Sequence, residues 1–209
     1  MEYGSTMLRM LAPIFWRDAI SETARSLLAA LSFGVLVGLV FLAPQPAPAE
    51  SLGSPGPDHE RLNPLIGEWT TVIKHWKTAE DEPTTLRGTA RCRWVLGGRF
   101  VEERAENETS KGGLFQSVTY LGYDRQTQLY DRFWLTNTWT GMFIERGRYD
   151  PDTNVIQTQG SEIDPTSGAV ILTTSELKIE SPNRHVFTSY TTGTDGVRWK
   201  QLEILYSKK

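Results

Sequence analysis

The sequence has little of what metal and nucleic-acid sites require: one cysteine, three histidines and no excess of basic residues. Cys92 alone can form neither a disulfide within the chain nor a cysteine-based zinc site. His59, His75 and His185 would all be needed for a three-histidine metal site, and no two of them have zinc-ligand spacing. The 25 acidic residues outnumber the 22 basic ones, giving a net charge of −3, which excludes a basic nucleic-acid binder. We therefore expect no metal, no cofactor and no nucleic-acid partner.

Common enzyme signatures are also missing. The chain contains no Gly-x-Ser-x-Gly element, no phosphate-binding Walker loop and no dinucleotide-binding glycine pattern. These absences weigh against the commonest enzyme classes, so the catalytic residues, if there are any, stay unassigned.

The N-terminal part of the chain is typical of an export signal. Residues 27–43 carry no charge and follow Arg25, and this length lies between a signal-peptide core and a short membrane anchor. Ala47 and Ala49 are small residues placed for cleavage before Glu50. We expect residues 1–49 to be a signal peptide, and the protein to be periplasmic or secreted. The alternative is an uncleaved anchor in the inner membrane facing the periplasm, which would be the protein's contact with a membrane.

The remaining residues divide into a linker and one domain. Residues 50–58 are rich in proline and glycine, which favour a tether over packed structure. Residues 59–209 are long enough to bury one hydrophobic core. This segment contains most of the seven tryptophans, seven tyrosines and eight phenylalanines.

The domain reads as a series of short strands after one helical turn near residues 59–65. In residues 85–96, Ala90, Cys92 and Trp94 alternate with Arg91 and Arg93, the two-residue period of a half-buried strand. Further runs of this kind are separated by turns rich in Gly, Asn, Asp and Pro. The expected strands are residues 68–77, 85–96, 99–108, 114–123, 129–137, 142–149, 155–163, 169–179, 185–192 and 197–207.

Strands joined by short turns, without crossover helices, form an antiparallel meander. A sheet of about ten strands either closes or leaves two exposed edges, and closure is the commoner solution. We therefore predict an all-β, antiparallel up-and-down barrel of about ten strands, preceded by the N-terminal hydrophobic helix. A two-sheet sandwich is the alternative.

Several short motifs stand in the order found in one family of barrels. The motifs are Leu65-Ile66-Gly67-Glu68-Trp69, Leu96-Gly97-Gly98-Arg99-Phe100, Leu121-Gly122-Tyr123-Asp124, the strand with Trp134, and Gly147-Arg148-Tyr149-Asp150. A Gly-x-Trp at the start of the first strand is how lipocalin-like, or calycin, barrels begin. With the other motifs, the chain resembles the bacterial domain-of-unknown-function family 1579 over roughly residues 59–207. The resemblance implies a lipocalin-type barrel and no agreed catalytic residues.

Aromatic residues with nearby polar groups predict a candidate ligand site. Small-molecule sites combine mostly apolar walls with a few hydrogen-bonding groups. Trp69, by contrast, is expected to close one end of the barrel. The alternative is that the aromatic residues of the candidate site simply fill the barrel. The site residues that we select on these grounds are Trp94, Tyr120, Trp134 and Trp139 with Gln116 and Asn137.

The strand at residues 99–108 is unusually charged. If one face of it points inward, Glu102 and Arg104 join the candidate site, paired with each other or with a polar ligand. Otherwise the strand runs past the barrel rim into solvent. In the inward arrangement, Glu102 or Glu103 is the best available general acid or base.

Three functions remain open from the sequence. The first is an exported protein that binds a small apolar or aromatic molecule in the barrel lumen. The second is an isomerase, cyclase or hydrolase that uses Glu102 or Glu103 in that lumen, with Arg104 holding an anion. The third is a structural or interaction barrel with a filled core.

Overall fold

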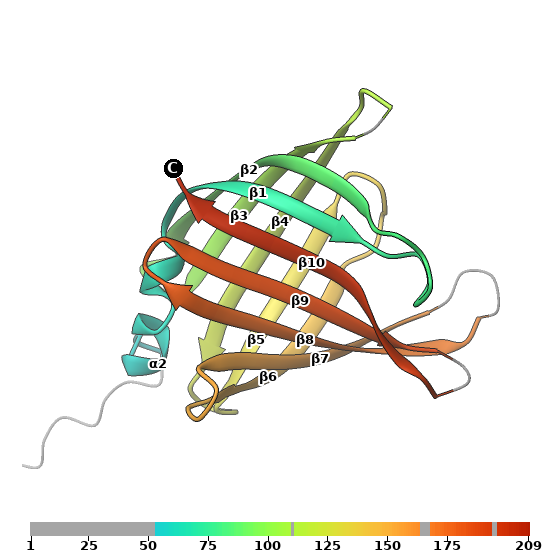
Figure 1. Ribbon diagram of the computed structural model, residues 1–209. Helices are drawn as coiled ribbons and strands as arrows, with labels where there is room; N and C mark the ends of the chain where they lie inside the picture. Colours follow the sequence, from blue (N-terminus) through green and yellow to red (C-terminus); the bar gives the residue numbers. More distant parts are fainter. Residues whose placement is uncertain (1–52, 110, 164–167, 194–195) are drawn as a thin grey trace, which may run out of the picture. The chain divides into compact units, whose positions relative to one another are not determined.

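The computed structural model describes residues 53–109, 111–163, 168–193 and 196–209. They contain a short helix, α2 (Pro57–Glu60), a 3-10 turn (Asn63–Leu65) and a ring of antiparallel strands (Figure 1). The strands are β1 (Gly67–His75), β2 (Thr84–Val95), β3 (Phe100–Glu108), β4 (Leu114–Asp124), β5 (Leu129–Thr136), β6 (Phe143–Asp150), β7 (Val155–Ile163), β8 (Val170–Ser181), β9 (Arg184–Thr192) and β10 (Arg198–Lys208).

The sheet closes into a barrel, because every strand pairs with its neighbours in sequence and β1 also pairs with β10. The expected all-β antiparallel barrel is thus confirmed, and the two-sheet sandwich is wrong. Closure leaves no unpaired edge among the described strands. In β2, Ala90 and Cys92 are buried while Arg91 and Arg93 are exposed, as their alternation predicts.

Tight turns hold adjacent strands in register. Between β4 and β5 the Asp124 carboxylate accepts a hydrogen bond from the backbone of Gln126, and between β6 and β7 Asp150 does the same for Asp152. Between β2 and β3, Gly97 and Gly98 have φ of +65° and +82°, values that glycine adopts without strain.

One end of the barrel, which we call the closed end, is sealed by the segment before β1. Trp69 and Leu62 are completely buried there, and Leu65 is nearly so. The Trp69 indole Nε1 donates to the Leu65 carbonyl oxygen at 2.8 Å. This matches the role expected for Trp69. Figure 1 shows α2 at this same end of the barrel.

The predicted hydrophobic helix at the N-terminus lies outside the described residues. Within the described ranges, no helix has the length and apolar character needed to cross a bilayer. Helix α2 begins at Pro57, within the stretch expected to be linker.

Candidate functional site

A cavity of about 280 Å³ occupies the barrel lumen toward the end opposite α2. We call it the lumen cavity. Its walls are mainly apolar and aromatic, and small polar residues of β4, β8 and β9 interrupt them. The apolar lining residues include Ile73, Leu86, Phe115, Trp134, Phe143, Leu202 and Ile204. The lumen is therefore not filled by its own side chains.

Arg132, which lines the cavity, forms a buried ion pair with Glu145. Arg132, on β5, donates from Nη1 to Glu145 Oε2 at 2.7 Å, and its side chain is 11% exposed. Glu145, on β6, is 1% exposed and also accepts a hydrogen bond from the Ser175 hydroxyl. The Arg132 guanidinium stacks on the Phe187 ring, 4.2 Å from its centroid. These contacts fix the guanidinium against the cavity.

Glu103 has a carboxyl group that lines the lumen cavity. Tyr206 donates to its Oε1 at 3.1 Å, and the Cys92 thiol lies 3.7 Å from Oε2. Burial raises the pKa of Glu103, although Arg132 and the hydrogen bonds from Tyr206 and Cys92 oppose this shift. Burial also raises the pKa of Tyr206 and that of Cys92. Burial therefore disfavours the charged form of each of these three groups.

Asn107 lies on the same face of β3 as Glu103 but further from the closed end of the barrel. Its Oδ1 accepts a hydrogen bond from the Thr71 hydroxyl at 2.7 Å, and its side chain is completely buried. Its amide Nδ2 has no hydrogen-bond partner among the described residues. Gly88 of β2 lies opposite, and a Cβ there would collide with Asn107.

The two histidines of the barrel, His75 and His185, lie at different distances from the closed end. His75 lines the cavity, and burial lowers its pKa. His185 lies below the cavity, stacked on Tyr206 at 4.1 Å between ring centroids and edge-on to Trp69 at 4.4 Å. Burial lowers the pKa of His185 to about 3. Among the described residues, no group of three or more His, Cys, Asp or Glu side chains could hold a metal ion.

Of the candidate site residues, Trp134 lines the lumen cavity. Trp94 shares the inward face of Cys92 but lies at the closed end, where its Nε1 donates to Asn63 Oδ1 at 2.9 Å. Trp139 is exposed in the β5–β6 connection. Gln116 and Asn137 are also exposed: the Gln116 side chain bonds Glu106, and that of Asn137 bonds the backbone of β4.

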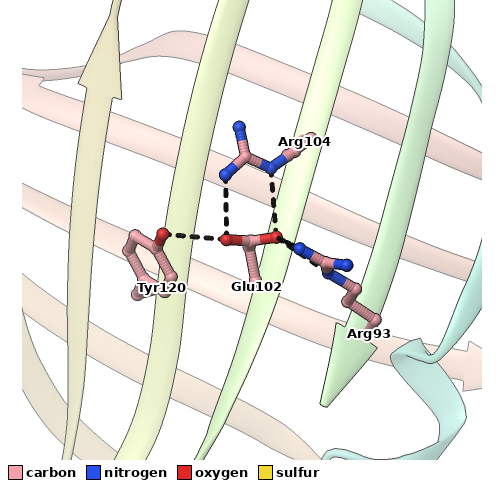
Figure 2. A network of polar contacts seen from close by, with 4 residues as sticks. All are labelled: Arg93, Glu102, Arg104 and Tyr120. Carbon is pink, nitrogen blue, oxygen red and sulfur yellow. Dashed lines mark hydrogen bonds and ion pairs between the residues drawn. The ribbon is translucent and has the colours of Figure 1, made fainter. Parts of the chain in front are cut away.

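Glu102, Arg104 and Tyr120 lie on the outer face of the barrel (Figure 2). Glu102 is 4% exposed because it is covered by Arg93 and Arg104, and it accepts a hydrogen bond from Tyr120 at 2.8 Å. The hydrogen bonds from Arg104, assisted by those from Tyr120 and Arg93, lower the pKa of Glu102 to about 2. The network holds Glu102 as a structural carboxylate.

The charged strand therefore neither leaves the barrel nor turns Glu102 inward. It spans the sheet from β2 to β4, and Glu103 is the carboxyl that enters the lumen. Sequence reasoning missed Arg132, Glu145, Ser175 and Tyr206. One available signal was that Arg132 stands two residues before Trp134 and so shares its face.

Fold and cavity together place the protein among closed antiparallel β-barrels with a single lumen large enough for a small molecule. The chain belongs to the family described as "Protein of unknown function (DUF1579)", which its sequence matches over residues 54–208. This confirms the resemblance drawn from the motifs. A comparison with curated proteins finds no match.

One solved structure supports the fold. The crystal structure of Rv2717c from M. tuberculosis aligns with a TM-score of 0.53 at 15% identity, covering 75% of this chain and 99% of that one. A redesigned β-barrel aligns with a TM-score of 0.38 at 15% identity, covering 71% and 95%. The first of these likenesses supports the barrel architecture and nothing further.

Proposed function

We propose that this protein is an exported, lipocalin-like barrel that binds a small apolar or aromatic molecule in its lumen cavity. The observation that carries the proposal is a cavity of about 280 Å³ with apolar and aromatic walls and a few fixed polar groups. This combination is typical of small-molecule sites, and the volume lies just below their usual range of about 300–1,000 Å³. Export is supported by the uncharged run at residues 27–43 and the small residues before Glu50.

The volume limits the size of the ligand. A cavity of roughly 150 Å³ accepts one benzene molecule. The lumen cavity, at about 280 Å³, therefore suits a ligand of about two aromatic rings. The cavity is too small to hold a tetrapyrrole such as haem with His75 as its ligand.

Exposed apolar side chains near the open end favour entry of such a ligand. They lie at strand ends or connections opposite α2, where a molecule passing from a membrane or another protein would first make contact. These residues are Leu114, Trp139, Met142, Ile163, Val170 and Val197.

Tryptophan fluorescence tests the proposal directly. We expect two-ring apolar compounds to change the emission of the wild-type protein in a saturable way. The Trp134→Phe variant should lose most of this response, whereas Trp139→Phe, altered outside the cavity, should keep it. A panel of such compounds that produces no saturable change would overturn the proposal.

Glu103 favours a second candidate function, proton transfer to a bound molecule. Its carboxyl faces the cavity, and burial raises its pKa, both of which suit a general acid. The test is Glu103→Gln, which should abolish turnover of a substrate while the barrel stays folded and still binds that substrate. Unchanged turnover in this variant would exclude Glu103 as the acid.

A further inference from the structure

We infer that the ligand of the lumen cavity carries an uncharged oxygen acceptor, such as a ketone, quinone or ester carbonyl, on its apolar body. The inference rests on the proposed binding function and specifies its ligand class. It follows from the hydrogen-bond donors and the charges that surround the cavity.

The cavity contains a donor that lacks an acceptor. Asn107 Nδ2 is unpaired within the described part of the chain, in a side chain that is completely buried. Arg132 donates from Nη1 to Glu145, and its planar guanidinium carries further N–H donors. Both residues line the cavity. Because buried donors without partners are costly, an oxygen acceptor on the ligand would bind favourably here.

The charges around the cavity disfavour an anionic acceptor. The positive charge of Arg132 is already matched by Glu145 at 2.7 Å. The carboxyl group of Glu162 also lines the wall of the lumen. A carboxylate ligand would add a further negative charge to a site whose one arginine is already paired, in surroundings of low dielectric.

A cationic ligand also fits poorly. An ammonium group donates hydrogen bonds and accepts none, so it would leave Asn107 Nδ2 unpaired. It would also lie near the arginine. The raised pKa of Glu103 reduces the negative charge available to hold a cation. An uncharged carbonyl can accept from Asn107 Nδ2 without disturbing the charge balance.

Three probes of nearly equal shape separate these properties. Naphthyl methyl ketone has the uncharged acceptor, naphthoate replaces its methyl group by a charged oxygen, and isopropenylnaphthalene replaces the carbonyl oxygen by carbon. Their affinities for the full chain can be measured by calorimetric titration. We expect the ketone to bind about tenfold more tightly than either of the other two, a difference of about 1.4 kcal/mol.

Each other result has a distinct meaning. If naphthoate binds as tightly as the ketone, the inference about charge is overturned and the binding function stands. If isopropenylnaphthalene binds as tightly, the requirement for an acceptor is overturned in the same way. If none of the three binds, the inference and the proposed function both fail.

A variant of the ion pair tests the physical cause. Glu145→Gln keeps a side chain of similar shape but releases the positive charge of Arg132. It should raise the affinity for naphthoate relative to the ketone by about tenfold. Glu176→Gln removes one charge on the outer face, where Glu176 pairs with Arg198, and should leave the ratio unchanged. An unchanged ratio in a folded Glu145→Gln protein contradicts the account. If this variant does not fold, the comparison of the three probes on the wild type still decides the matter.

Discussion

Glu102 and Glu103 are adjacent in the chain, yet the barrel gives them opposite properties. Glu102 faces outward beneath two arginines, which hold its pKa at about 2. Glu103 faces the cavity, where burial raises its pKa. The difference arises because successive side chains of a strand point to opposite faces of the sheet. Only one of the two carboxyls can therefore take part in lumen chemistry.

His185 provides a prediction at the scale of a single residue. It is 2% exposed, and burial lowers its pKa to about 3, below the value of about 6.5 expected in the unfolded chain. The unfolded chain therefore binds a proton on this residue at acidic pH, while the folded protein does not. The contribution is fully favourable above about pH 6.5 and is lost as the pH falls toward about 3.

We expect the wild type to lose about 2 kcal/mol of unfolding free energy through this group between about pH 7 and pH 5. His185→Phe keeps an aromatic ring between Trp69 and Tyr206 but cannot be protonated, so this part of the loss should disappear. Urea unfolding at the two pH values measures it. An equal loss in the variant and the wild type would show that His185 is not the cause.

At the scale of strands, the sequence predicts well where each strand begins and ends. It predicts poorly how far along the barrel axis a side chain lies. All ten expected strands lie within two residues of the observed ends, because alternation and turn residues are local signals. Alternation also gives the face of a strand, as for Cys92. It does not give depth along the barrel, so Trp94 was expected to line the site but lies at the closed end. In β5, alternation alone does not give the inward face, which depends on the pairing with β4 and β6.

The pairing of β2 with β3 offers a prediction at the same scale. Gly88 faces Asn107, and an added Cβ would meet both the Asn107 side chain and the backbone of β3. We expect Gly88→Ala to lower the free energy of unfolding by about 2 kcal/mol and to displace Asn107 from Thr71.

Chemical denaturation of Gly88→Ala measures this cost. Thr89→Ala is the matched control, because Thr89 is the exposed neighbour on the outer face, and it should change stability by less than about 0.5 kcal/mol. Equal stability of Gly88→Ala and the control would mean that the two strands can move apart at no cost.

For the whole molecule, closure and the plug at one end determine where a ligand can bind. Trp69, Leu62 and Leu65 fill the closed end, so the empty volume lies toward the opposite mouth. The sequence suggested the plug and the aromatic walls. It could not supply the ion pair of Arg132 and Glu145, since these residues come together only through the register of β5 with β6.

The central claim is that the lumen cavity is the binding site, and filling the cavity tests it most directly. Ala105 lies on its wall, and the ring of Ala105→Phe would occupy the space that a ligand needs. Naphthyl methyl ketone should raise the melting temperature of the wild type and of Thr89→Phe, changed on the outer face, by several degrees. It should leave the melting temperature of folded Ala105→Phe unchanged. An equal rise in Ala105→Phe would contradict binding in the lumen.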